Sequence, residues 1–280
     1  MFSPRFVVYP LWLAFKRKIK SRIVVCPRGA LYNSALSVKK YKKIPLLFLY
    51  KQLAIHKLVT FHATNKREEA AIQKYFPGSK TVVADNLPSM AQLPFESVEK
   101  KAGSLKCIFI ARIVPIKNLL FLLQALKETK DAQIELTIAG PIEDETYWAE
   151  CKKHIAALPP NISADYIGPK ANDELAGLIR RHHLFVLPTT GENFGHSIFE
   201  AMQAGRPVLI SDQTPWLHLQ QYSAGWDLPL KFPEKFTAAL LQMAASTQEE
   251  FDVLAKSAWQ FASRFINNPD NLKQYRILFA

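Results

Sequence analysis

Two glutamates in the second half of the chain, Glu192 and Glu200, are candidates for binding a polar ligand. Glu192 lies in a loop between Gly191 and Gly195, and Glu200 lies eight residues later in an otherwise largely apolar helix. A carboxylate inside an apolar helix is costly unless a polar group meets it. At about 1.5 Å per helical residue, the two glutamates are expected within roughly 12 Å of each other. The sequence therefore predicts a polar binding site along this stretch.

Two basic residues complete the set of candidates. Arg112 and Lys117 bracket the sequence IVPI, between the end of an expected strand and the start of the next expected helix. Lys117 is expected at that helix N-terminus, where unpaired backbone amides already favour anions. Two cations there suit a diphosphate, and the glutamate spacing suits the two sugars of a nucleotide sugar. Taken singly, the cations also fit a charged surface loop, Glu192 a helix N-terminal charge, and Glu200 a structural ion pair. Together, the four residues favour a ligand.

Residues 105–262 predict the sheet that positions these residues. Strands are expected at about 106–111, 134–139, 163–167, 184–187 and 207–210, and helices at about 118–129, 144–157, 172–182 and 197–204. This alternation is typical of a doubly wound parallel sheet, whose ligands bind outside the carboxyl ends of the strands. The loops after these strands hold the candidate binding residues Arg112, Gly140, Pro169, Lys170 and the segment Glu192 to His196.

Residues 1–100 predict only part of a second parallel α/β domain. Short strands and helices alternate there, but no glycine-rich strand-to-helix turn opens the segment. Residues 85–104 are polar, contain two prolines and are expected to form a linker. The expected organisation is an N-terminal domain with linker over 1–100, a ligand-binding domain over 101–262, and a C-terminal helix over 263–280 that crosses back to the N-terminal domain.

The charge of the chain is concentrated at its beginning. The net charge is +12, yet residues 1–60 contain thirteen Lys or Arg and no Asp or Glu. Such a face attracts anionic lipid, nucleic acid or a phosphorylated acceptor, although a merely soluble surface is the simpler alternative for any one lysine. No nucleic-acid-binding module is recognisable, so nucleic acid is not the expected partner. We expect an anionic membrane surface.

The cysteines, the apolar runs and the absence of metal-ligand spacing indicate where the protein is located and whether it needs a cofactor. Three cysteines without CxxC spacing indicate reduced thiols and a cytoplasmic protein. No apolar run reaches the roughly 18–20 residues of a membrane span, and the basic cluster follows the apolar run of residues 6–15, which is the wrong order for a secretory signal. No Cys/His cluster has metal-ligand spacing, so neither a metal nor another cofactor is expected. The expected location is therefore peripheral, at the inner face of the cytoplasmic membrane.

Several segments resemble glycosyltransferase family 4, a retaining family with the GT-B fold. The resemblance is carried by FIARIVPIKNLLFLLQAL, LTIAGP, DYIGPKANDELAGLIRRHHLFVLPTTGENFGHSIFEAMQAG and PVLISDQTPW. PRGALY, FHATNKREEAAI and VVADNLP are similar to the end of the N-terminal domain in capsule and lipopolysaccharide enzymes. The resemblance implies a complete C-terminal Rossmann-like domain and a partial N-terminal one, without about the first 80–90 residues of a usual member.

The resemblance also implies roles for the candidate residues. Arg112 and Lys117 would bind the donor diphosphate, and Glu192 would face the transferred sugar; these three are the expected catalytic residues. Glu200 would hydrogen-bond the ribose hydroxyls. The other expected substrate-binding residues are Asn193, Phe194, Gly195 and His196 around the sugar and phosphate, Gly140 beside them, Pro169 and Lys170 near the base, and Arg28 on the acceptor side.

The predicted function is transfer of a hexose-type sugar, with retention, from a UDP- or GDP-linked donor to a polysaccharide or lipid-linked acceptor. The resemblance places this reaction in bacterial surface polysaccharide synthesis, in capsule, O-antigen or lipopolysaccharide. The alternative is an N-terminally truncated, catalytically inactive chain that binds a nucleotide or a partner.

Overall fold

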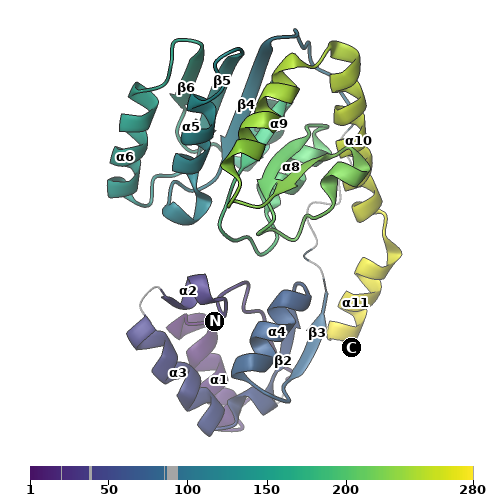
Figure 1. Ribbon diagram of the computed structural model, residues 1–280. Helices are drawn as coiled ribbons and strands as arrows, with labels where there is room; N and C mark the ends of the chain where they lie inside the picture. Colours follow the sequence, from purple (N-terminus) through teal and green to yellow (C-terminus); the bar gives the residue numbers. More distant parts are fainter. Residues whose placement is uncertain (20, 38–39, 85, 87–93, 280) are drawn as a thin grey trace. The chain divides into compact units, whose positions relative to one another are not determined.

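The computed structural model describes residues 1–279, with the exception of residues 20, 38–39, 85 and 87–93 (Figure 1). The chain divides into two compact units. Unit 1 consists of Met1–Leu87 and Asn268–Ala280, and unit 2 of Pro88–Asn267. The sequence pattern places the corresponding boundaries near residues 100 and 262.

Unit 2 is built on one six-stranded parallel sheet with the order β6-β5-β4-β7-β8-β9. The strands are β4 (Ser104–Ile110), β5 (Gln133–Ala139), β6 (Ile162–Tyr166), β7 (Leu184–Leu187), β8 (Val208–Ser211) and β9 (Gly225–Leu228). From β4 the chain first runs outward to β6, then returns to pair β7 with the other side of β4. The loops after β4 and β7 therefore leave the sheet side by side, at the point where the strand order reverses.

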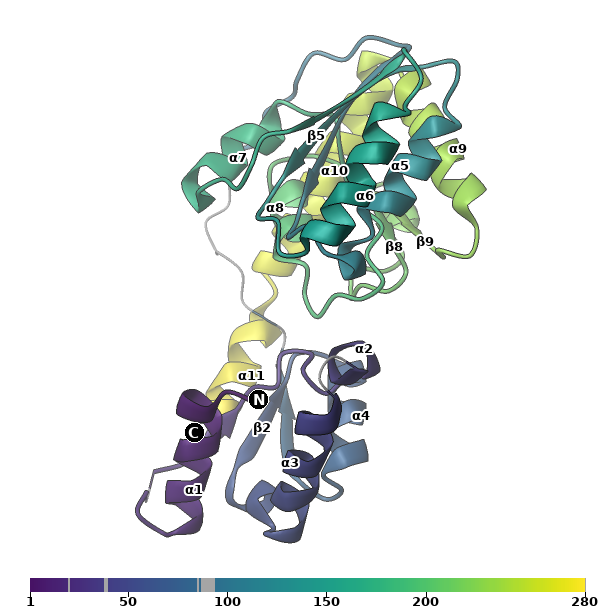
Figure 2. The same cartoon turned by 90° about the vertical axis from the view of Figure 1, so that its left-hand side faces the viewer.

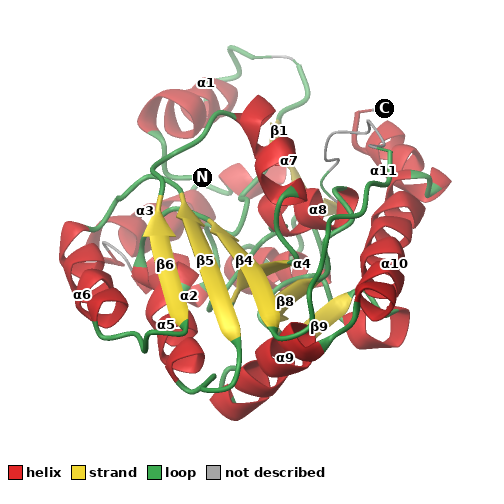
Figure 3. Cartoon of the chain, turned by 90° about the horizontal axis from the view of Figure 1, so that it is seen from above, coloured by secondary structure: helices red, strands yellow, loops and turns green. Residues whose placement is uncertain are grey.

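Helices cover both faces of this sheet (Figures 2 and 3). One layer holds α5 (Leu119–Lys127), α6 (Glu145–Ala156) and α9 (Pro233–Ala245). The other holds α7 (Asn172–Arg180), α8 (His196–Gln203) and α10 (Gln248–Ile266). Two short 3₁₀ turns, η3 (Pro115–Lys117) and η4 (Leu219–Tyr222), lie in the connections.

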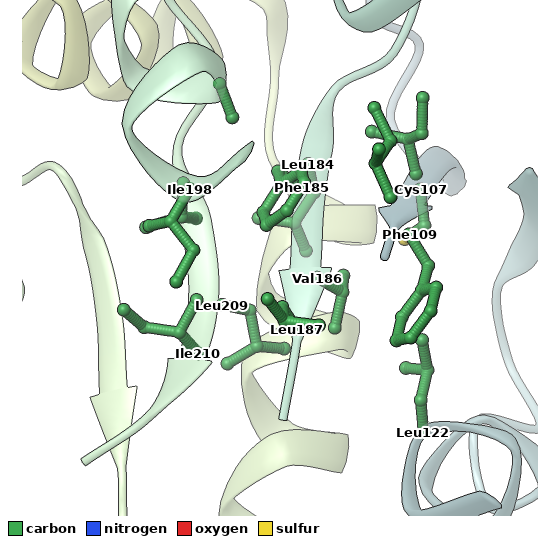
Figure 4. Close-up of a cluster of buried hydrophobic side chains, with 14 of the residues drawn as sticks. Cys107, Phe109, Leu122, Leu184, Phe185, Val186, Leu187, Ile198, Leu209 and Ile210 are labelled. Carbon is green, nitrogen blue, oxygen red and sulfur yellow. The ribbon is translucent and has the colours of Figure 1, made fainter. Parts of the chain in front are cut away.

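The core on both sides of the sheet explains why the central strands are mostly apolar. All residues of β7 and β8 are buried, as expected of strands covered on both faces. Ile198 of α8 packs toward Ile210 of β8, while Phe109 of β4 packs toward Leu122 of α5 (Figure 4). Cys107 lies in the same core, and burial raises the pKa of its thiol. The apolar residues of α8 thus fix that helix on the sheet.

A fully buried arginine ties three segments of unit 2 together. The Arg206 guanidinium donates hydrogen bonds to the carbonyls of Gly205 (2.7 Å), Arg180 (2.7 Å) and Glu96 (3.1 Å). Burial lowers the pKa of Arg206 to about 10, so the side chain stays charged at neutral pH. It satisfies carbonyls at the ends of α7 and α8 and holds the extended segment that precedes β4.

That extended segment differs from the linker expected over residues 85–104. Its described part, residues 94–103, packs on unit 2. Lys100 is buried and its ammonium donates to the carbonyls of Lys101, Ala244 and Ser246 at 2.9–3.1 Å. Polar composition suggested a linker because the apolar stem of a lysine and its carbonyl partners cannot be recognised from the sequence.

Unit 1 is a smaller parallel α/β unit. Its three strands, β1 (Val24–Val25), β2 (Thr60–Ala63) and β3 (Lys80–Val83), pair in the order β1-β2-β3. Around them lie η1 (Pro4–Val8), α1 (Tyr9–Phe15), α2 (Asn33–Ser37), α3 (Lys40–Gln52), η2 (Ile55–Leu58), α4 (Lys66–Tyr75) and α11 (Pro269–Phe279). α11 lies against β3, and the ring of Tyr275 meets His62 edge-on, so the end of the chain belongs to this unit.

The parallel α/β class predicted from the sequence is confirmed, with local differences. α3 begins at Lys40 and contains Pro45, a residue that usually interrupts a helix. Pro45 lies in the second turn on the exposed side of the helix, where it removes one intrahelical hydrogen bond. Across the described residues, no helix is long and apolar enough to cross a membrane.

The buried histidine His183 makes unit 2 sensitive to acid. Its Nδ1 accepts a hydrogen bond from the Lys106 amide (2.9 Å), so Nε2 carries the proton and donates to the Glu99 carbonyl (2.9 Å). Burial lowers the pKa of His183 from 6.5 to about 4. The unfolded chain therefore binds more protons between these values, and stability is lost as the pH falls from 6.5 towards 4.

We expect the free energy of unfolding of unit 2 to drop by roughly 2–3 kcal/mol over that pH range. Denaturant titrations at several pH values, followed by the fluorescence of the buried tryptophans, would measure it. His183→Gln should be less stable at pH 7 but should show a shallower pH dependence. His218→Gln, at an exposed position, should keep the original dependence. An unchanged slope in His183→Gln would contradict the assignment.

Candidate functional site

The candidate site lies where the strand order of unit 2 reverses. The loop after β7 is bonded to the loop after β4 through the Ile116 carbonyl, which accepts from the Thr190 amide (2.8 Å) and the Thr189 hydroxyl (2.9 Å). The side-chain amide of Asn118 donates to the Pro188 carbonyl (3.0 Å). These bonds join the two loops into one structure. Both predicted catalytic loops therefore contribute to the same site.

Lys117 and Glu192 form an ion pair between these loops. Their side chains are only 14% and 13% exposed, so water screens the pair much less than a surface pair. The Glu192 amide also donates to the Gln213 carbonyl (3.0 Å), which fixes the backbone of the loop. The structure thus brings together two residues that the sequence predicts to act together.

Lys117 lies directly before the N-cap of α5, close to the helix N-terminus that the sequence predicts, but within a 3₁₀ turn. It ends the 3₁₀ turn η3, and Asn118 follows with a left-handed backbone (φ +60°) before α5 begins at Leu119. The extra turn moves the lysine out of the helix and towards the loop after β7. The prediction missed it because the left-handed Asn118 interrupts a segment whose apolar pattern continues into the helix.

Arg112 is exposed and its guanidinium is bonded to the carboxylate of Glu143 (2.7 Å). The two residues belong to neighbouring loops, after β4 and after β5, which the Ile113–Ile142 bridge holds in register. Sequence reasoning did not identify Glu143. The available signal was an acidic residue in the loop after β5, shortly after the predicted Gly140.

Gly140 occupies a position that only glycine fits. Its φ is +139°, and a Cβ atom there would lie 1.9 Å from the Ala111 carbonyl oxygen. Its carbonyl accepts from the Tyr166 hydroxyl (2.8 Å). The glycine allows the loops after β4 and β5 to approach each other closely, while direct contact with a ligand stays a prediction.

The start of α8 has no side-chain cap, so its first backbone amides face the loop after β7. Gly195 precedes the helix with a left-handed backbone (φ +77°), and no side chain caps the first turn. Phe194 is buried against Trp216, whose indole donates to the Phe194 carbonyl (2.5 Å). Phe194 therefore acts through packing and its backbone, and the ring of His196 lies 4.7 Å from it. Such a helix start favours an anion.

Glu200 lies one helical turn further into α8 and is partly buried. Among the described residues, its carboxylate has neither a hydrogen-bond donor nor a cation as a partner. Burial raises the pKa of Glu200, with no opposing interaction. The structural ion pair considered for Glu200 is thus absent from the described part of the chain, and the carboxylate is suited to accept hydrogen bonds from a bound molecule.

The other predicted binding residues are more dispersed. Asn193 belongs to the loop between Glu192 and α8. Pro169 and Lys170 are exposed in the loop after β6, the edge strand of the sheet. Arg28 belongs to unit 1, where it has a left-handed backbone (φ +53°) before Gly29, whose amide donates to the buried Glu68. Their roles towards a ligand remain predictions.

The residues that the structure describes include no group of three or more His, Cys, Asp or Glu that could hold a metal ion. The histidines with resolved partners serve the fold. His182 bonds Thr137 and the Leu178 carbonyl, and His62 faces Cys26. A reaction without a metal or another cofactor stays a prediction.

Comparison with protein families identifies the central part of the chain. Residues 92–220 match the family described as Glycosyl transferases group 1. This region holds the loops after β4, β5, β6 and β7 together with α8, so the candidate site lies within the matched residues. Comparison with curated proteins gives no match.

Solved structures are similar in fold. TarM from S. aureus, in complex with fondaparinux, alpha-GlcNAc-glycerol and UDP, is 16% identical with a TM-score of 0.62, over 81% of this chain and 46% of that chain. HepE from Anabaena, in complex with UDP and glucose, is 16% identical with a TM-score of 0.72, over 99% of this chain and 76% of that chain.

WaaG, a glycosyltransferase involved in lipopolysaccharide biosynthesis, is 15% identical with a TM-score of 0.67. The match covers 96% of this chain and 80% of that chain. These similarities confirm the predicted GT-B-like α/β fold. The chain spans about half of the TarM chain and three quarters or more of the other two.

The unpartnered carboxylate of Glu200 should reduce stability in the absence of a ligand. Because its folded-state pKa is raised, the stability contribution is present below the unfolded pKa and is lost as the pH rises. The free energy of unfolding of Glu200→Gln at pH 7 should therefore equal that of the original chain or exceed it by up to about 1 kcal/mol, as measured by denaturant titration. Glu150→Gln, on the exposed side of α6, is the matched control and should change stability little. A clear loss of stability in Glu200→Gln would show that the carboxylate has a structural partner.

Proposed function

We propose that this chain is a retaining hexosyltransferase of glycosyltransferase family 4. It would transfer a sugar from a UDP- or GDP-linked donor to a glycan or lipid-linked acceptor. The observation that carries the proposal is the unpartnered Glu200 carboxylate, in the same segment as the Lys117–Glu192 pair and the open start of α8. This segment lies inside the region that matches the Glycosyl transferases group 1 family.

Glu200 is proposed to bind the ribose of the donor nucleotide. A carboxylate has two acceptor oxygens, which suits the two neighbouring hydroxyls of a ribose. Its burial makes the charge costly without a ligand, so the hydrogen bonds from ribose replace the water that the carboxylate has lost. The ligand would thereby remove the cost that raises the pKa of Glu200.

The diphosphate is proposed to lie between Arg112, Lys117 and the first amides of α8. The Lys117 ammonium has three N–H groups and uses one on Glu192, so it can also donate to phosphate oxygens. Arg112 has further donors beyond those that meet Glu143. Fixed donors of this kind stabilise the charge that develops on the leaving phosphate without reorganisation during the reaction.

Transfer is proposed to occur on one face of the sugar. The bond between the anomeric carbon and the phosphate oxygen breaks, and the acceptor oxygen bonds to the same face of that carbon. The acceptor proton passes to the departing phosphate oxygen, which balances the exchange and retains the anomeric configuration. Glu192 is proposed to position the donor sugar, because its ion pair with Lys117 holds it in one orientation.

The proposed setting is bacterial surface polysaccharide synthesis at the inner face of the cytoplasmic membrane. Similarity to WaaG supports it, since that protein is involved in lipopolysaccharide biosynthesis. The basic residues of positions 1–60 would attract an anionic membrane surface, and such attraction weakens as salt screens it.

Donor binding tests the proposal directly. Calorimetry with UDP- and GDP-sugars should show binding to the folded chain, and Lys117→Ala should weaken it by about tenfold or more, since it removes a charge-assisted contact. Lys153→Ala, on the exposed side of α6, is the matched control and should bind like the original chain. If the folded protein bound none of these nucleotides, the proposed function would be lost.

A second candidate function is nucleotide or partner binding without transfer. The observation that favours this candidate is that the chain spans 46% of the TarM chain. Turnover separates the two functions. A sugar transferred by this 280-residue chain would exclude the second candidate, while binding without transfer across common nucleotide sugars would favour it.

A further inference from the structure

The first helical segment of unit 1 presents its aromatic side chains to solvent. η1 and α1 run consecutively from Pro4 to Phe15. All four aromatic residues of this segment are exposed: Phe6 (84%), Tyr9 (57%), Trp12 (48%) and Phe15 (39%). We call them the aromatic face. Large aromatic side chains are usually turned towards the core of a domain, so four in succession on the outside indicate a surface that binds something.

The same segment is firmly packed on its other side. Leu11 is buried in the core of unit 1, and Val7 and Val8 pack against that core. The rings of Tyr9 and Trp12 stack with their centres 6.1 Å apart. The outward position of the aromatic face therefore follows from a helix held in place, with its apolar residues divided between the core and the outside.

The charges around the aromatic face identify the partner. Arg5 lies within the segment, and the exposed Lys16, Arg17 and Lys18 follow it directly. The first acidic residue of the chain is Glu68. A second copy of the chain would bring two basic surfaces together, and lysine is depleted in protein–protein interfaces. Aromatic residues flanked by lysine and arginine are characteristic of helices that lie in the interface of an anionic bilayer.

The neighbouring helix α3 has the same combination. Tyr41 (72%) and Phe48 (62%) are exposed on it, while Leu47 and Tyr50 are buried. Its lysines add positive charge, and both α1 and α3 contact the 3₁₀ turn η2. Unit 1 therefore carries two helices whose outward sides combine aromatic and cationic residues.

We propose that the aromatic face of η1–α1 inserts into the headgroup region of an anionic lipid bilayer. This inference rests on the proposed membrane partner and names the element that enters the membrane. Lys16, Arg17 and Lys18 contact the lipid phosphates, and the four aromatic rings lie among the headgroups and the upper acyl chains. Binding thus has an electrostatic part and an apolar part, which can be measured separately.

Trp12 reports insertion directly. It is the one exposed tryptophan of the five in the chain, all of which the structure describes. Vesicles of phosphatidylglycerol and phosphatidylcholine that contain brominated acyl chains should quench its fluorescence. Trp12→Phe keeps an aromatic side chain and should abolish the quenching. Vesicles of phosphatidylcholine alone should give little quenching.

A double substitution that changes no charge distinguishes insertion of the aromatic face from electrostatic attraction to the bilayer. The double variant Phe6→Ser/Tyr9→Ser keeps every charge, so the salt dependence should remain while vesicle binding falls by about tenfold or more. The control Leu217→Ser/Val253→Ser removes exposed apolar residues of unit 2 and should bind like the original chain. Circular dichroism would show that the variants remain folded.

Each contrary result has a definite meaning. If vesicles bind but Trp12 is not quenched and the double variant binds normally, charge suffices and insertion is excluded, while the proposed membrane partner stands. If no vesicle binds at low salt, both fall, whereas donor calorimetry still tests the transferase proposal. If sedimentation shows a dimer that the double variant abolishes, a second copy covers the aromatic face and insertion is excluded.

Discussion

The central constraint on unit 2 is a parallel sheet buried on both faces. Every residue of β7 and β8 is buried, and the core of β4 is apolar as well. Polar side chains that bind a ligand must therefore stand beyond the strand ends. The strand order brings these side chains together. β4 and β7 are neighbours, but β4 connects towards β5 on one side of the sheet and β7 towards β8 on the other, so the loops after them begin next to each other. Arg112, Lys117 and Glu192 belong to these two loops for this reason.

The charges of the site are balanced in part. The Lys117–Glu192 pair compensates itself, and Arg112 is compensated by Glu143. Glu200 is an acidic group that the described residues leave without compensation, and the helix dipole makes the uncapped start of α8 positively polarised. A molecule with both hydroxyls and an anionic group satisfies both. This pattern gives the proposed donor a physical basis that does not depend on resemblance to other proteins.

The sequence predicts β4 to β8 of unit 2 and the loops of its site, because apolar runs and loop residues follow local rules, but it missed the short edge strand β9. The prediction assigned Glu192 and the two cations to one ligand site, and the structure pairs Glu192 with Lys117. Glu143 and the left-handed Asn118 were missed, since each depends on how two loops meet. The burial of Arg206 was also missed, because arginine is usually a surface residue and its carbonyl partners cannot be identified from the sequence.

The buried thiol of Cys107 can serve as a probe for local opening of unit 2. A maleimide or disulfide reagent reaches this sulfur only when the sheet of unit 2 opens, since the residue is fully buried and its thiolate is disfavoured. Cys26 is the one cysteine of unit 1 and is only partly buried. The labelling rate of Cys107, resolved by peptide mass, would therefore report how often unit 2 opens under native conditions, with the partly exposed Cys26 as a reference that can react without opening.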